Sequence, residues 1–74
     1  KAGEKGRVYT PEQLLAMSAR RSVKTTQRGF ARLLHVSVDS VQDWEQGLRF
    51  PRGAARTLLR VAQNHPEVLE KLAT

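Results

Sequence analysis

Residues Thr26–Pro51, TQRGFARLLHVSVDSVQDWEQGLRFP, decide the fold of this chain of 74 residues. Two segments of this stretch carry apolar residues at helical spacing. Each segment follows a hydroxyl residue that suits a helix N-cap, Thr26 or Ser37. Gly47 follows the second segment, and glycine is common just beyond the last turn of a helix. The stretch therefore predicts two short helices joined by a tight turn.

The apolar side chains of these two helices fall where two crossing helices must touch. Phe30, Ala31 and Leu34 form one stripe on the first helix. Val41 and Trp44 are three positions apart on the second helix and share its buried face. A tryptophan can also stack on the bases of single-stranded nucleic acid. The spacing from Val41 favours the core for Trp44.

The boundaries of the pair follow from its caps. The first helix runs from the Thr26 cap through Leu34, and His35 and Val36 make the turn. The second helix begins after Ser37 and ends at Gln46. Such a turn holds the second helix by one face and leaves its other face free.

Three further segments have helical patterns, and no alternating run predicts a strand. A capping box formed by Thr10 and Gln13 opens a helix from Pro11 to about Arg21. The other two helices are expected at Gly53–Asn64 and from Glu67 to about Ala73. The inward positions are Leu15, Ala16 and Ala19, then Ala55, Leu58, Leu59 and Ala62, then Val68, Leu69 and Leu72. The sequence predicts an all-α domain of five helices.

Residues 10–74 are expected to form this single domain. Residues 1–9 are polar, basic and contain glycine, which predicts a flexible arm or linker. Basic arms sometimes touch DNA, although fraying is the ordinary behaviour of such a segment. The chain begins at Lys1 rather than at a methionine, so we expect a preceding N-terminal part with a function of its own.

Composition narrows the classes of partner. The net charge of +6 favours a polyanion, with a basic charge that serves only solubility as the alternative. The chain has no cysteine, which excludes disulfides and suits a reducing cytoplasm. No apolar run matches a membrane span or a signal peptide, so no membrane partner is expected. His35 and His65 lack companion ligands, so neither a metal nor another cofactor is expected.

The free face of the 38–46 helix carries the candidate recognition residues. Short polar side chains near the N-terminus of such a helix reach base edges in the major groove of DNA. The candidate base-reading residues are Val38, Asp39, Ser40, Gln42 and Asp43. The candidate phosphate contacts flank this helix and are Thr26, Gln27, Arg28, Ser37, Arg49 and Arg52. Three other arginines are interpreted as part of a solvent-exposed face without a role in binding. They are Arg21, Arg56 and Arg60.

Several of these residues together resemble the Cro/CI-like (XRE) helix-turn-helix family, which has a lambda-repressor-like fold. The resemblance covers most of residues 10–64, and its W-E-x-G-x-x-x-P ending is quite specific. The matching residues are Thr26, Gln27, Phe30, Ala31, Val36, Ser37, Val41, Trp44, Glu45, Gly47 and Pro51. The continuation at residues 56–61 and 65–67 is similar to the DNA-binding domains of antitoxins from bacterial type II toxin–antitoxin pairs.

The resemblance implies a homodimer that binds an inverted-repeat operator and represses its own operon. It implies base-reading positions for Asp39, Gln42 and Asp43. Many relatives have amides or arginines there, so the two aspartates are a departure. An aspartate accepts a hydrogen bond from cytosine N4 but repels phosphates. His35 replaces the glycine usual in the turn, and histidine adopts a left-handed conformation less easily.

The family comparison and helical geometry also indicate a structural ion pair between Arg20 and Glu45. A single carboxylate without a partnered base makes no enzyme. The apolar residues of the last two helices exceed what one small core needs, so they are either ordinary core or a dimer seam. These residues are Val61, Val68, Leu69 and Leu72. A cognate toxin is the other expected partner, bound through the part that precedes Lys1.

Two other functions stay open on the sequence. A phage-type or stand-alone transcriptional regulator would use the same DNA-binding surface without a toxin. Alternatively, the helix-turn-helix serves as a protein-interaction module, and its charge faces an acidic partner. Salt distinguishes these classes, because a DNA binder loses affinity steeply as the salt concentration rises.

Overall fold

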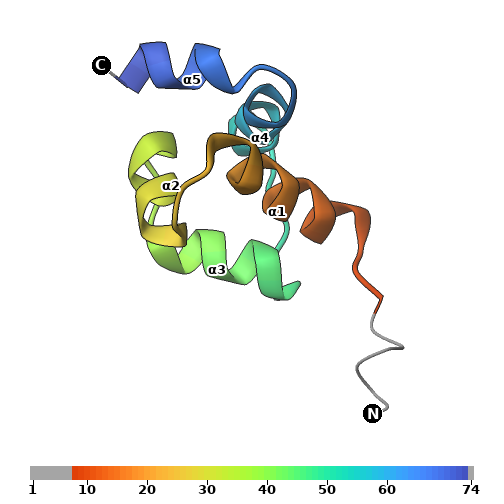
Figure 1. The fold of residues 1–74 in the computed structure, drawn as a ribbon. Coiled ribbons are helices and arrows are strands. Elements are labelled where there is room, and N and C mark those ends of the chain that lie inside the picture. Colours follow the sequence, from red (N-terminus) through yellow and green to blue (C-terminus); the bar gives the residue numbers. More distant parts are fainter. Residues whose placement is uncertain (1–7, 74) are drawn as a thin grey trace.

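A computed structural model describes residues 8–73, which form five helices and contain no strand (Figure 1). The helices are α1 (Pro11–Val23), α2 (Gln27–Leu34), α3 (Val38–Gln46), α4 (Ala54–Asn64) and α5 (Pro66–Ala73). The prediction of an all-α fold with five helices is confirmed. The arm predicted for residues 1–9 lies outside the described residues except for Val8 and Tyr9.

The first helix begins as its capping box predicts. The Thr10 hydroxyl accepts the Gln13 backbone N–H at 3.1 Å, and the Gln13 side-chain oxygen accepts the Thr10 N–H at 3.0 Å. The end of α1 was predicted too early, because the helix continues to Val23. Lys24 ends it in a left-handed conformation with φ 59°. A lysine in this conformation is uncommon, so no residue type marked the boundary.

The turn between α2 and α3 is built from two caps. His35 takes the left-handed conformation with φ 60°, and its N–H reaches the carbonyl groups of the last turn of α2. The Val36 N–H donates to the Ala31 carbonyl at 3.0 Å. The Ser37 hydroxyl accepts the Ser40 N–H at 3.1 Å and opens α3. Three residues therefore reverse the chain between the two helices.

The boundaries of α4 and α5 differ slightly from the prediction. Gly53 precedes α4 rather than starting it, with φ +56° and ψ −129°. Only glycine adopts this conformation without strain. Helix α5 begins at Pro66, one residue earlier than predicted, because proline suits the first position of a helix.

One core joins all five helices. Its buried apolar residues are Ala16, Ala19, Phe30, Ala31, Leu34, Val41, Trp44, Leu59, Ala62 and Leu69. In Figure 1, α2 lies to the left of α1 and α3 lies below it, α4 is seen nearly end-on above α1, and α5 crosses the top of the domain. The small alanine side chains at the core let neighbouring helices approach closely, and Phe30 of α2, Val41 of α3 and Leu59 of α4 are the largest side chains that are fully buried. No helix within residues 8–73 has the length and apolar character that a membrane span needs.

Candidate nucleic-acid interface

Helix α3 is fixed by its inward face. Val41 is fully buried and Trp44 is only 5% exposed. Both pack among the buried residues of α1, α2 and α4. The opposite face of α3 points away from this core. The position of the free face is therefore set by the hydrophobic packing of the inward face and by polar contacts at the end of the helix.

Those polar contacts centre on Glu45, whose carboxylate pairs with Arg20 of α1. The Arg20 Nε lies 2.7 Å from Glu45 Oε2, and its Nη2 donates to Oε1 at 3.0 Å. Gln27 of α2 donates to the same Oε1 at 3.1 Å. Gln13 donates to the Glu45 backbone carbonyl at 3.0 Å. The start of α2 and two turns of α1 are thus tied to the last turn of α3.

The geometry of the pair explains its charge state. Hydrogen bonding to Glu45, reinforced by the attraction of the carboxylate, raises the pKa of Arg20 above its ordinary value. Partial burial opposes this rise without cancelling it. The pair therefore favours the charged form of the guanidinium. Because both Glu45 oxygens accept hydrogen bonds from protein groups, the carboxylate acts as a structural group of the fold.

The outward face of α3 carries four of the five predicted base-reading residues. Asp39 is exposed, and Ser40, Gln42 and Asp43 are half-buried. Val38 does not belong with them, because its side chain packs against the core. It stands at the first position of α3, where the turn brings it against the domain. The assignment of Val38 to the free face was wrong.

The predicted phosphate contacts divide into two groups. The hydroxyl groups of Thr26 and Ser37 cap α2 and α3, and Gln27 is hydrogen-bonded to Glu45. Arg28 and Arg52 are exposed, with no side-chain partner among residues 8–73. Arg32, which is not among the predicted phosphate contacts, is also exposed one turn after Arg28. The i, i+4 spacing of these two arginines places them on the same side of α2.

Arg49 lies elsewhere than the sequence suggested. Its Nε is 3.1 Å from Asp43 Oδ2, and its Nη2 donates to Ser40 Oγ at 3.0 Å. The guanidinium therefore rests on the outward face of α3 rather than beside it. The spacing from Asp43 to Arg49 is not helical, because Gly47 ends the helix between them. No periodicity in the sequence indicated this contact.

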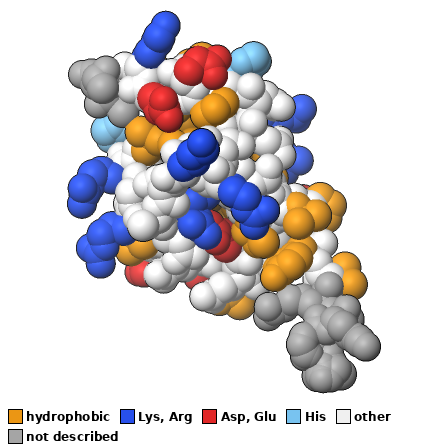
Figure 2. All heavy atoms as spheres, viewed as in Figure 1, with side chains coloured by type: hydrophobic (Ala, Val, Ile, Leu, Met, Phe, Trp, Pro, Cys, Tyr) orange, Lys and Arg blue, Asp and Glu red, His pale blue; other side chains and the backbone are white. Residues whose placement is uncertain are grey.

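Charged side chains are distributed unevenly between the α2–α3 end of the domain and the α5 end. Figure 2 shows Lys and Arg side chains at the left edge, where α2 lies, and also across the middle and right of this face, whereas the upper part, where α5 lies, carries acidic side chains together with basic ones. Both acidic residues of α5, Glu67 and Glu70, are exposed. A polyanion is therefore attracted to the α2–α3 end of the domain more than to the α5 end. Within residues 8–73, no group of acidic residues and histidines has the arrangement of a metal site.

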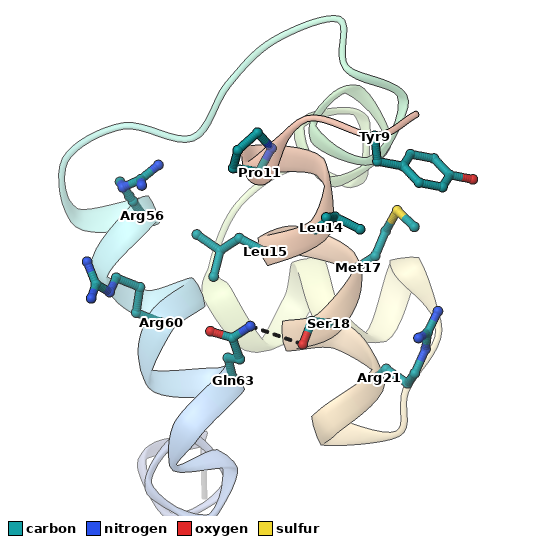
Figure 3. A pocket seen from close by; sticks show the side chains of 10 residues that line it. All are labelled: Tyr9, Pro11, Leu14, Leu15, Met17, Ser18, Arg21, Arg56, Arg60 and Gln63. Carbon is teal, nitrogen blue, oxygen red and sulfur yellow. Dashed lines mark hydrogen bonds between the residues drawn. The ribbon is translucent and has the colours of Figure 1, made fainter. Parts of the chain in front are cut away.

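A hollow of about 810 Å³ lies between α1 and α4 and contains none of the candidate DNA contacts (Figure 3). Its wall includes Leu14 and Leu15 of α1, with Arg56 and Arg60 of α4 at one edge. The side-chain amide of Gln63 donates to the Ser18 hydroxyl across it at 3.1 Å. No lining residue comes from α2 or α3. The candidate interface is therefore an outer helix face, not this hollow.

The predicted dimer seam loses one of its four members. Leu69 is only 4% exposed and belongs to the core, so it cannot lie on a free surface. Val68 and Leu72 of the same helix are 41% and 75% exposed, and Val61 of α4 is half-buried. Leu69 was misassigned because its helical spacing is as suitable for the core as for a seam.

The chain is similar to an antitoxin. It is 41% identical over 64 residues to antitoxin HigA-2 of Vibrio cholerae serotype O1 (strain ATCC 39315 / El Tor Inaba N16961). The match covers 86% of this chain, which spans about 60% of the length of HigA-2. No family model matches the chain. The similarity supports a relationship to the antitoxins of toxin–antitoxin systems, as the sequence resemblance implied.

Proposed function

We propose that this chain is a sequence-specific, double-stranded DNA-binding transcriptional repressor domain of the Cro/CI-like type. It belongs to an antitoxin that represses its own toxin–antitoxin operon. The observation that carries the proposal is the way α3 is held. Its inward face is packed in the core and tied to α1 and α2 through Glu45, while its outward face presents Asp39, Gln42 and Arg49.

This arrangement suits the major groove. The groove admits an α-helix, and short polar side chains near the helix N-terminus reach the base edges. The turn that holds α3 is only three residues long, so the helix cannot swing away from a base pair. Exposed arginines flank α3 on two sides, Arg28 from α2 and Arg52 from the loop before α4. We expect them to meet the phosphates on either side of the groove.

A homodimer completes the proposal. One recognition helix of nine residues covers only a few base pairs, which is too few for a unique genomic address. Two copies related by a twofold axis require inverted half-sites about one helical turn, roughly 34 Å, apart. The exposed apolar side chains Val68 and Leu72 of α5, together with the half-buried Val61 of α4, form the proposed seam between the copies.

A toxin is the second proposed partner, because the relative is an antitoxin. The chain matches only 60% of HigA-2, and we propose that toxin binding resides in the part of such an antitoxin outside the match. This division of labour leaves the helix-turn-helix free to bind DNA while the toxin is held. The function of the domain is then regulatory, with no chemical step.

The proposal is tested by selecting bound duplexes from a random pool. An enriched inverted repeat, with a binding constant that falls steeply as salt rises, is the expected result. Two protein chains per selected duplex are expected by ultracentrifugation. If no duplex is retained at low salt, the domain does not bind DNA and the protein-interaction module is the correct class. An enriched site bound by one chain would contradict the dimer alone.

A further inference from the structure

We propose that Arg49 reads a base edge, and that the base is guanine. This inference deepens the proposed function, on which it rests, because it names the chemistry that the operator must present. It also changes the role expected of Asp43, which becomes a positioning residue for Arg49. The sequence alone predicts the opposite roles, with Asp43 on the base and Arg49 on a phosphate.

The path of the backbone brings Arg49 to α3. Gly47 has φ +80°, a left-handed conformation that reverses the chain at the end of the helix. The N–H of Leu48 then donates to the Asp43 carbonyl at 2.9 Å. The loop is thereby closed back onto the last turn of α3, and Arg49 follows directly.

Two contacts show that the side chain runs back along α3 toward the N-terminus. Asp43 Oδ2 lies 3.1 Å from Arg49 Nε, and Ser40 Oγ accepts from Nη2 at 3.0 Å. Ser40 is in turn held by Ser37, with the two hydroxyl oxygens 3.0 Å apart. Ser40 stands in the first turn of α3. The guanidinium is therefore at the height of the helix where recognition helices contact base edges.

The guanidinium retains unused donors in this position. Arginine has five N–H groups in a planar fork, and Asp43 and Ser40 engage Nε and Nη2. Within residues 8–73, the structure records no partner for Nη1. Guanine presents two acceptors, O6 and N7, at the spacing of an arginine fork. No other base presents two acceptors in the major groove, so guanine is the base that this fork selects.

The same contacts explain why an aspartate is tolerated on a DNA-facing surface. A bare carboxylate at position 43 would repel nearby phosphates. The arginine cancels its charge, and the carboxylate fixes a long side chain that otherwise has many rotamers. A fixed arginine loses less conformational freedom on binding than a mobile one. Asp39 has no such partner recorded among the described residues, so a substitution of Asp39 is a matched control for the same substitution of Asp43.

The test compares Arg49→Lys with Arg52→Lys on the operator that the wild-type protein selects. Lysine keeps the positive charge but lacks the fork, so a phosphate contact tolerates it better than a guanine contact does. Each base pair of the half-site is exchanged in turn, and affinity is measured for each duplex. We expect Arg49→Lys to weaken binding about 5- to 150-fold on the guanine-containing site and to lose discrimination at that one position. Arg52→Lys should leave the preferred sequence unchanged.

A second variant, Asp43→Asn, tests whether Asp43 positions Arg49. Asparagine has nearly the same shape but cannot pair with a guanidinium as an ion. We expect a smaller loss of discrimination than with Arg49→Lys, at the same base pair. Asp39→Asn is the control and should not alter the preference at that base pair.

Three results separate the possible failures. Uniform weakening by Arg49→Lys on every duplex would make Arg49 a phosphate contact and overturn the inference. Loss of a cytosine preference in Asp43→Asn, with Arg49→Lys silent, would return the base contact to Asp43. In both cases the protein still selects a site, so the proposed function stands. If the wild-type protein selects no site, both proposals fail.

Discussion

Two pairs of an acidic residue with an arginine lie on opposite faces of α3, and they differ in how much water reaches them. In the inward pair, the Glu45 side chain is 9% exposed and that of Arg20 is 30% exposed. In the outward pair, the corresponding values are 30% for Asp43 and 61% for Arg49. The inward pair joins separate helices, whereas the outward pair joins α3 to the loop that follows it.

The difference teaches what each pair is suited to do. An exposed ion pair contributes little to folding, because water competes for both charges. Breaking a pair that is largely removed from water is costly, because the remaining charge has no replacement for its partner. The inward pair is therefore expected to stabilise the fold. The outward pair leaves its arginine accessible to a ligand, so it is expected to act in binding.

The largest expected effect comes from the hydrophobic part of the inward face. Trp44→Ala removes a nearly buried aromatic side chain and should cost about 3–5 kcal/mol of the free energy of unfolding. This is a large share of the stability of a small domain. Thermal or urea unfolding measures the loss. Gln46→Ala, an exposed position on the same helix, is the control. A nearly unchanged melting temperature would show that Trp44 is available for base stacking instead.

The inward ion pair is the next target. Glu45→Gln should lower the free energy of unfolding by about 1–3 kcal/mol, between the values for exposed and buried pairs. Asp43→Asn on the outward face should cost less than 1 kcal/mol. Glu45 raises the pKa of Arg20, so this contribution is complete below the ordinary arginine pKa and is lost only above it. Equal costs at pH 7 and pH 10 are therefore expected, and equal losses in the two variants would contradict the comparison.

The inward face of α3 could be predicted from the sequence because it depends on helical spacing and capping residues, which are local patterns. Val41 and Trp44 are one helical turn apart, and two hydroxyl caps with a glycine fix the ends of α2 and α3. The Arg20–Glu45 contact joins residues 25 positions apart. Helical spacing alone does not specify it. The resemblance to a family with the same turn was needed to indicate it.

The outward face and the termini of helices were harder to predict. Arg49 reaches Asp43 because Gly47 reverses the chain, a three-dimensional effect that no periodicity reveals. Lys24 ends α1 although lysine has no preference for a left-handed conformation. Leu69 and Leu72 share the same helical pattern, yet only the first is buried. For Leu69 and Leu72, the packing of neighbouring helices rather than the local pattern decides which side chain is buried.

The outward face should control sequence preference without affecting stability. Gln42→Ala and Asp39→Ala each remove a polar group from the free face of α3. If either group contacts a base, the preference at that base pair should change by about 1–3 kcal/mol. The free energy of unfolding should change much less than in Trp44→Ala. Affinity for duplexes with single base-pair exchanges measures the preference. An unchanged preferred site in both variants would remove α3 from the role of recognition helix.

Charge at the edge of the interface should have a smaller and uniform effect. Arg28→Ala should weaken binding to all duplexes alike and reduce the slope of log affinity against log salt by about one unit. Arg60→Ala, which removes the same charge from the edge of the hollow between α1 and α4, is the matched control. The control should leave the slope nearly unchanged. A shift in the preferred sequence in Arg28→Ala, with an unchanged slope, would contradict its phosphate role.

The smallest effect on folding is expected for an exposed residue of α5. This helix also has an inward and an outward face, and its outward face belongs to the proposed dimer seam. Leu72 is 75% exposed, so Leu72→Glu should change the free energy of unfolding by less than about 0.5 kcal/mol. Leu69→Glu, three residues earlier on the same helix, places a carboxylate in the core and should unfold the domain. Leu72→Glu therefore separates assembly from folding, which a substitution of Leu69 cannot do. On an inverted-repeat duplex, the folded Leu72→Glu protein should bind the two half-sites independently and with lower affinity, because a charge in the seam opposes close contact of the copies. Cooperative binding equal to that of the wild-type protein would place the dimer contact on another surface.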